Sequence, residues 1–68
     1  MPVTKIIEVV GTSPTGSDDA VREALKAASR SLRGIHRAEV IDVQCDVRDG
    51  EVVAWNVRLK VAFPVESK

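Results

Sequence analysis

Residues 51–65 alternate apolar and polar side chains for longer than an ordinary strand. The apolar positions are Val53, Trp55, Val57, Leu59, Val61, Phe63 and Val65. A period of two predicts a β-strand with one buried face. Strands usually have about 5–6 residues, so a small domain cannot cover one of this length. We expect the uncovered apolar surface to form an interface.

The size of the chain points in the same direction. Its 68 residues form a single domain, residues 1–68, and so small a domain buries only about 60% of its unfolded surface. Such chains are stabilised by disulfides, metals or oligomerisation. Cys45 is the only cysteine and His36 the only histidine, so one chain can form neither a disulfide nor a His/Cys zinc site. We therefore expect a homo-oligomer.

The composition argues against nucleic-acid and membrane partners and against secretion. The 10 basic and 10 acidic residues cancel, whereas a nucleic-acid binder carries a basic excess. Trp55 and Phe63 are too few aromatics for a base-stacking surface. No apolar run approaches the ~20 residues of a membrane span, and residues 1–5 do not resemble a signal peptide. A single cysteine suits the reducing cytoplasm, which is the expected location.

The first half of the chain predicts a strand and a helix. Val3–Val10 has β-branched residues on both faces, which is typical of a strand covered on two sides, and Gly11–Gly16 is rich in turn formers. Ser17 is the expected N-cap, and Gly34 follows the helix end. The helix, of roughly 16 residues, has the apolar stripe Val21, Ala24, Leu25, Ala28 and Leu32. An Asp18–Arg22 ion pair fits its polar side.

Arg37–Val47 is a third alternating segment, joined to the last by Asp49-Gly50. A two-residue turn would pair odd positions with even ones and mix the two faces. We therefore predict a three-residue loop, residues 48–50, with Gly50 in the left-handed conformation. This register pairs Val43 with Trp55, Cys45 with Val53 and Ile41 with Val57, unless a bulge shifts it. The predicted fold class is α+β, with the order β-α-β-β and a three-stranded antiparallel sheet around one helix.

Three short motifs then resemble a known family. Residues 9–13 (Val-Val-Gly-Thr-Ser) precede an alanine-rich helix, as the "VGTS" opening of dodecins does. Residues 38–40 (Ala-Glu-Val) are similar to the "AEV" or "FEV" step of that family. Residues 60–63 (Lys-Val-Ala-Phe) are similar to its "VAF" or "VGF" end. The resemblance covers nearly the whole chain, and the ordered set is more specific than any single motif.

The resemblance implies a non-enzymatic, hollow homo-dodecamer that stores or sequesters flavins (riboflavin or FMN) in pairs at subunit interfaces. In flavin-binding members a tryptophan just before the "AEV" step stacks on the flavin ring, and a glutamine on the third strand bonds its polar edge. This chain has Arg37 and Asn56 at those two positions. Arginine can stack through its guanidinium plane, and asparagine keeps the amide with less reach. We therefore expect weak flavin binding or none.

The candidate cofactor-binding residues are Arg37, Ala38, Trp55 and Asn56. Trp55 could replace the missing stacking residue, but its strand spacing favours packing. Arg37 could contact a phosphate or stack on a ligand, although an exposed ion pair is the simpler interpretation. Asn56 could equally form a hydrogen bond to the edge of a ligand or have a purely structural role.

An ion is the alternative ligand. Dodecin-like proteins without the tryptophan include a calcium-binding branch, which this chain resembles more closely. Glu39, Asp42 and Asp46, together with Glu51, offer oxygen ligands, which calcium prefers. No EF-hand pattern is present, so these carboxylates would have to meet between subunits. A phosphate-bearing ligand or a purely structural adaptor role remains open.

Catalysis has little support in the sequence. Ser13 and Ser17 have no positioned base unless His36 comes from another subunit. A phosphate nest at residues 12–14 is possible, but strand exit and helix entry explain the same residues. His36 is expected at the surface, and Cys45 is expected to be an inert apolar filler.

Overall fold

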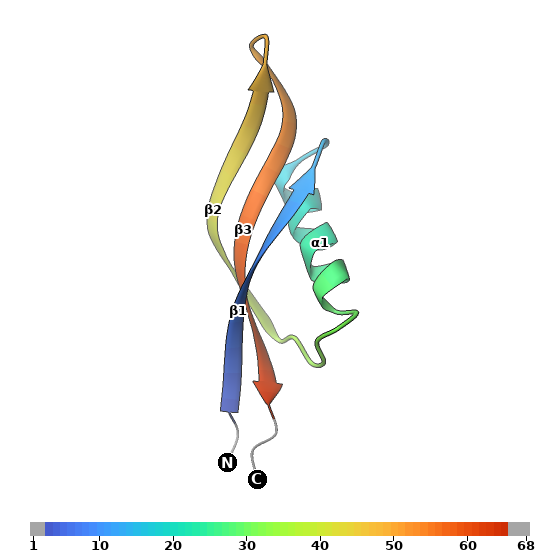
Figure 1. Ribbon diagram of the computed structural model, residues 1–68, viewed down its shortest axis with the longest axis vertical. Coiled ribbons are helices and arrows are strands. Elements are labelled where there is room, and N and C mark those ends of the chain that lie inside the picture. Colours follow the sequence, from blue (N-terminus) through green and yellow to red (C-terminus); the bar gives the residue numbers. More distant parts are fainter. Residues whose placement is uncertain (1–2, 66–68) are drawn as a thin grey trace.

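A computed structural model describes residues 3–65 as a β-α-β-β unit (Figure 1). Its elements are β1 (Val3–Ser13), α1 (Ser17–Ala28), β2 (Arg37–Arg48) and β3 (Glu51–Val65). The strands form one antiparallel sheet in the order β1-β3-β2, which confirms the predicted α+β fold. Residues 1 and 2, part of the segment inspected for a signal peptide, lie outside the described residues.

Strand β1 is longer than predicted. It continues to Ser13, because Thr12 pairs with Asn56 and Ser13 with Trp55 on β3. The turn is therefore confined to residues 14–16. Gly11 lies inside the strand, where a Cβ atom would stand 2.1 Å from the Ala20 carbonyl oxygen. Glycine at this position lets α1 lie directly against β1.

Helix α1 has 12 residues, fewer than predicted. Ser17 is its first helical residue rather than its N-cap; Gly16 holds the cap position without a side-chain hydrogen bond. Beyond Ala28, two amide groups bond carbonyls three residues back, and the Ser29 hydroxyl donates to the Leu25 carbonyl. Serine hydroxyls that bond the backbone in this way compete with helix continuation. Leu32 lies beyond the helix yet still packs against the core.

The β2–β3 hairpin corrects the predicted loop. The turn has two residues, Asp49 and Gly50, at φ 51° and 79°, and Arg48 pairs with Glu51. Positive φ at both central residues is the backbone of a type I′ turn, whose twist suits a hairpin. Matching faces are restored instead by a register shift between Asp46 and Val47.

The hairpin pairs therefore differ from the predicted ones. Val43 pairs with Val57 and Cys45 with Trp55. A second shift, between Val40 and Asp42, leaves Ile41 out of the register. The predicted three-residue loop and its three pairs were wrong, although apolar positions still face apolar positions in these two pairs.

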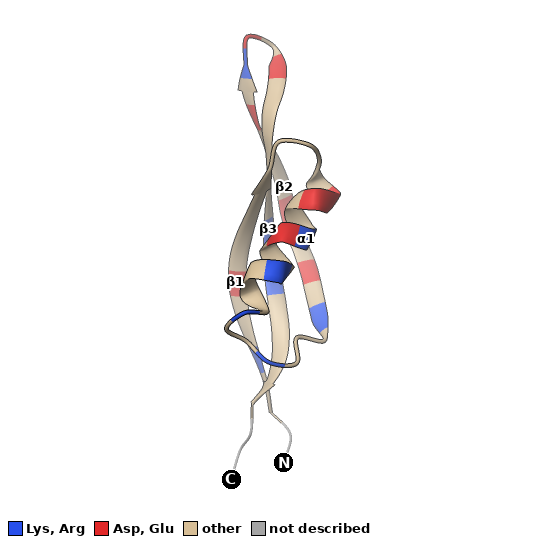
Figure 2. Ribbon diagram, turned by 90° about the vertical axis from the view of Figure 1, so that its right-hand side faces the viewer, with Lys and Arg blue, Asp and Glu red and all other residues tan. Residues whose placement is uncertain are grey.

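The hydrophobic core lies between α1 and one face of the sheet. Ala20 and Ala24 of the helix pack on Val57, Leu59 and Val61 of β3. Half-buried residues surround this cluster: Ile7, Val9, Val21, Leu25, Leu32 and Ile35. The helix packs mainly on β1 and β3, so the β2 side of the sheet has little cover. Figure 2 shows α1 on one side of the sheet, with the hairpin extending past it. The predicted Asp18–Arg22 ion pair is present at 3.3 Å.

Much apolar surface remains exposed in the single chain. The protomer measures 54 × 19 × 13 Å, and its radius of gyration is 14.1 Å, compared with about 11 Å for a compact chain of this length. Its accessible surface is 5140 Å², whereas a monomer of this mass exposes about 4,200 Å². Ile6 and Val10 are 59% and 63% exposed, so the expected second cover over β1 does not come from this chain.

The exposed large apolar residues are Val3, Ile6, Val10, Val40, Ile41, Val43, Val47, Val52, Val53 and Val65. Most of them lie on β2, on β3 near the turn, or on the face of β1 that points away from α1. Within residues 3–65, the one helix is too short and too polar to cross a bilayer.

Candidate functional site

The face of the sheet that points away from α1 carries most of the polar side chains, and we call it the helix-free face. Residues of β3 alternate, so those next to the core positions Val57 and Leu59 point to this face. The register brings three rows of three residues together across the strands. The rows are Thr12–Asn56–Gln44, Val10–Arg58–Asp42 and Glu8–Lys60–Glu39.

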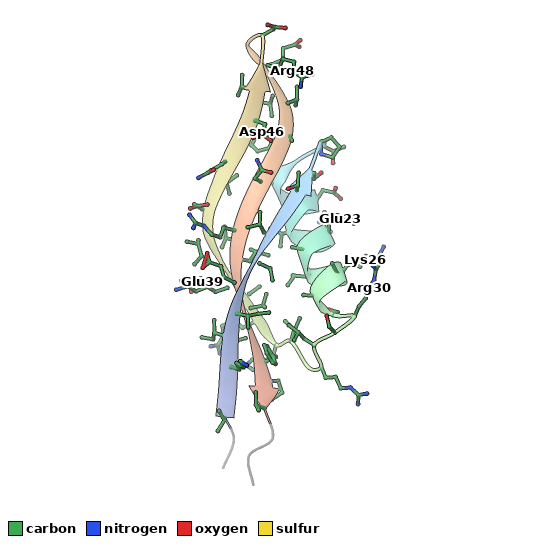
Figure 3. The ribbon with its side chains drawn as sticks, in the orientation of Figure 1. Glu23, Lys26, Arg30, Glu39, Asp46 and Arg48 are labelled. Carbon is green, nitrogen blue, oxygen red and sulfur yellow. The ribbon has the colours of Figure 1, made fainter. Side chains whose placement is uncertain are left out.

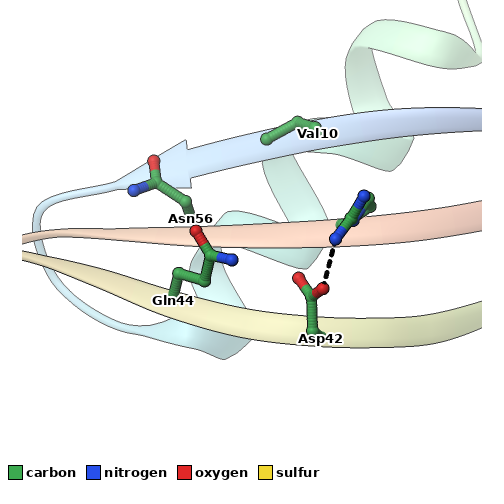
Figure 4. Close-up of a pocket in the computed structure, with 5 residues that line it drawn as sticks. Val10, Asp42, Gln44 and Asn56 are labelled. Atoms are coloured by element: carbon green, nitrogen blue, oxygen red, sulfur yellow. Dashed lines mark hydrogen bonds and ion pairs between the residues drawn. The ribbon is translucent and has the colours of Figure 1, made fainter.

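A pocket of about 300 Å³ lies on the helix-free face (Figure 4). Its lining residues are Val10 from β1, Asn56 and Arg58 from β3, and Asp42 and Gln44 from β2. All three strands contribute, because the central strand β3 supplies the floor and its neighbours supply the walls. The pocket is open to solvent and combines one apolar side chain, two amides and one ion pair.

Arg58 is the fixed charge of this pocket. Its guanidinium donates a short hydrogen bond to Asp42 Oδ2, and its Nη1 lies 3.5 Å from Glu8 Oε1. The hydrogen bond and charge of Asp42, followed by the charge of Glu8, raise the pKa of Arg58 above its already high ordinary value. The guanidinium therefore stays charged throughout the physiological pH range.

The amide side of the pocket is more open to a ligand. Thr12 Oγ1 donates to Asn56 Oδ1 at 2.9 Å, which orients the Asn56 side chain. Within residues 3–65, no hydrogen bond engages the Asn56 Nδ2 group or the Gln44 amide. These groups can donate to, or accept from, the polar edge of a small molecule.

The structure separates the predicted ligand residues. Asn56 lies in the pocket, but Arg37 and Ala38 pair with Ala62 and Val61 at the far end of the sheet. Arg37 is five residues from Asp42 along β2, or about 16 Å at the usual rise of a strand. Arg37 and Asn56 can therefore contact one small ligand only if different subunits supply them.

Trp55 lies on the other face. It pairs with Ser13 and Cys45, on the side of the sheet that carries α1, and is half-buried. Its ring thus points away from the pocket, as the packing interpretation requires. Cys45, expected to be a buried filler, is exposed in this chain because the helix does not reach it.

The predicted metal ligands follow one strand without forming a cluster. Glu39 and Asp46 are widely separated along β2 (Figure 3), and the register sets Glu39 opposite Lys60 and Asp42 opposite Arg58. No group of three or more His, Cys, Asp or Glu side chains within residues 3–65 could hold a metal ion. A calcium site between subunits remains a prediction.

The residues of the VGTS motif have structural roles. Gly11 allows the close contact with α1, and Thr12 orients Asn56. Ser13 is only 1% exposed, and its hydroxyl donates to Asp19 Oδ2 at 2.7 Å and accepts from the Thr15 amide. These bonds tie the strand exit to the first turn of α1 and give Ser13 a structural role.

Sequence reasoning missed Glu8, Val10, Gln44 and Arg58. The available signal was the alternation along each strand. A residue two positions from one that faces away from the core also faces away from the core. The opposite charges of Asp42 and Arg58 would then have suggested a cross-strand pair.

Comparison with known proteins gives a consistent result. The dodecin family model matches residues 3–66. The calcium dodecin of Mycobacterium tuberculosis is 35% identical over 63 residues, which are 93% of this chain and 89% of that protein. The dodecin of Thermus thermophilus is 34% identical over 64 residues, 94% of this chain and 93% of that protein. The solved dodecin of Streptomyces coelicolor superposes with a TM-score of 0.93 at 43% identity, covering 98% of this chain and 96% of that one. The chain belongs to the dodecin family.

Proposed function

We propose that the protein is a non-enzymatic homo-dodecamer that binds and stores a small ligand on the helix-free face, where subunits meet. One observation carries this proposal: the pocket is only partly built within one chain. Asn56 and Gln44 offer unengaged amide groups, while Arg37 lies about 16 Å away along β2. A second subunit can supply what the first lacks.

The exposed apolar surface supports assembly. The single chain exposes about 900 Å² more than a compact monomer of its mass. Val43, Val47 and Val53 are 46%, 61% and 42% exposed, and neighbouring copies would bury them. The matching family model and the relative from Thermus thermophilus both bear the name dodecin. A cytoplasmic location agrees with the unpaired, exposed Cys45 thiol.

The proposed ligand is of the flavin class, riboflavin or FMN, held weakly. Asn56 and Gln44 can bond the polar edge of the ring, and Arg37 of another subunit can stack on its plane. A guanidinium offers a smaller stacking surface than an indole, and among residues 3–65 no aromatic side chain lines the pocket. We therefore expect weak affinity in the wild-type protein.

Riboflavin titration followed by fluorescence tests this ligand. Wild type is expected to quench riboflavin fluorescence weakly or not at all. Arg37→Trp is expected to bind riboflavin at least tenfold more tightly than wild type, because a stacked base–aromatic pair contributes roughly 1–3 kcal/mol and tenfold in affinity corresponds to about 1.4 kcal/mol. Arg33→Trp, which adds an indole at an exposed loop position, is the matched control. If Arg37→Trp behaves as Arg33→Trp does, flavin is not the ligand of this pocket.

Calcium is the second candidate, favoured by the carboxylates along β2 and by a relative named calcium dodecin. Glu39 and Asp46 are exposed, so a neighbouring subunit can add ligands to them. Isothermal titration with CaCl₂ should then show binding that the double variant Glu39→Gln/Asp46→Asn removes. Equal heats from both proteins would eliminate this candidate. A dodecamer that binds neither riboflavin nor calcium would favour the structural role.

A further inference from the structure

Arg58 contacts carboxylates on both neighbouring strands. Its guanidinium bonds Asp42 of β2 and lies 3.5 Å from Glu8 of β1. The outer strands are about 10 Å apart, twice the usual strand spacing, and the planar fork of arginine spans this gap. Lys60 lies one row away, between Glu8 and Glu39 in the register, but within residues 3–65 no ion pair joins it to either.

Without Arg58, the carboxylates of Glu8 and Asp42, one from each neighbouring strand, would lose the positive charge that lies between them. Two carboxylate ligands, completed by water, form a sparse site of the kind that Ca²⁺ accepts with low affinity. The guanidinium occupies the position between these carboxylates and supplies the positive charge that they require.

We infer that Arg58 is a specificity-determining residue: it takes the place of a divalent cation between Glu8 and Asp42, and so keeps calcium out of the pocket and leaves it to ligands that bind through hydrogen bonds. This inference rests on the proposed ligand-binding role of the pocket. It also removes Asp42 from the candidate calcium ligands, so any calcium site must use Glu39 and Asp46 instead.

Calcium titration of an Arg58→Gln variant tests the inference. Glutamine removes the charge, retains a polar side chain and keeps the backbone pairing of β3. Arg58→Gln is expected to gain a calcium site that wild type lacks at this position, with a dissociation constant in the ~10⁻⁴–10⁻³ M range of sparsely liganded sites. Arg58→Gln/Asp42→Asn should lose that gain.

Two controls separate the pocket from general charge effects. Arg48→Gln removes an exposed arginine near the hairpin turn, changes the net charge equally and should bind calcium as wild type does. Arg58→Lys keeps a cation in the pocket and should also behave as wild type. A gain in Arg48→Gln equal to that in Arg58→Gln, or no gain in Arg58→Gln, would overturn the inference.

The wild-type protein provides a test that does not depend on the folding of any variant. Its crystals, soaked in terbium chloride as a calcium analogue, should show no anomalous peak between Glu8 and Asp42; a peak there would refute the role of Arg58. The proposed function is checked separately, by sizing and by riboflavin titration. Failure of the inference about Arg58 is therefore distinguishable from failure of the proposed function.

Discussion

At the scale of single residues, Asn56 and Arg58 show what the sequence could and could not predict. Asn56 was identified because the resemblance placed it at a ligand-contact position. Arg58 appeared only as one polar residue in an alternating strand. Its role depends on the register that brings Asp42 beside it and on the diagonal contact with Glu8. A sequence without a known register cannot supply either contact.

Gly11 leads to a prediction about stability. In Gly11→Ala, the added Cβ would meet the Ala20 carbonyl oxygen at 2.1 Å and the Ala24 Cβ at 2.7 Å. The helix must then move away from β1, which should lower the free energy of unfolding by about 1–3 kcal/mol. Urea denaturation followed by circular dichroism measures this change.

Gly16→Ala is the matched control for Gly11. Its new Cβ would approach only the end of the Asp18 side chain, at 3.0 Å, and a flexible side chain can move aside. The control should change stability far less. Equal effects of the two substitutions would show that the loss comes from glycine itself rather than from the strand–helix contact.

At the scale of elements, the periodic patterns predicted the type and order of all four segments and the bounds of β3, but not the ends of β1 and α1. The apolar stripe of α1 predicts a helix that continues to Leu32, which does pack on the core. The serines that follow Ala28 end the helix earlier. The side-chain pattern correctly indicates that a two-residue turn alone would mix the two faces of the hairpin. The chain solves it with a register shift beside Asp46, which side-chain patterns alone cannot locate.

The turn itself can be tested with Gly50→Ala. Gly50 has φ 79° with open space around it, so the substitution introduces backbone strain without a steric clash. A left-handed residue with a Cβ costs about 1–2 kcal/mol, and the midpoint of chemical denaturation should fall accordingly. Asp49→Asn, at φ 51°, should have little effect, because asparagine tolerates this conformation. An unchanged midpoint in Gly50→Ala would mean that the turn adopts another conformation in solution.

At the scale of the whole molecule, size and cysteine count predicted a need for partners, and the exposed valines show where partners can bind. Val43 is 46% exposed and pairs with the core residue Val57. Val43→Asp should therefore leave the isolated fold nearly intact but place a charge in a subunit interface. Sedimentation should shift from about 89 kDa, twelve times the 7.4 kDa chain, toward much smaller species.

Ala27→Asp, on the exposed side of α1, is the control for Val43→Asp and should sediment as wild type does. Wild type that sediments near the mass of a single chain would refute the dodecamer itself. The number of subunits and their arrangement depend on surfaces that meet only in the assembly, so they could not be derived from one chain and came from the family resemblance alone.

The strand order also limits when the sheet can form during protein synthesis. Strand β3 lies between β1 and β2 and is the last of the three along the chain, so Val3 must find Val65. Until β3 has left the ribosome, β1 has no strand to pair with and α1 lacks the part of its packing surface that β3 supplies. We expect the sheet to form only after translation of this segment, through contacts between distant parts of the chain, which slow folding. The valines that would join subunits in the proposed assembly are exposed throughout that interval.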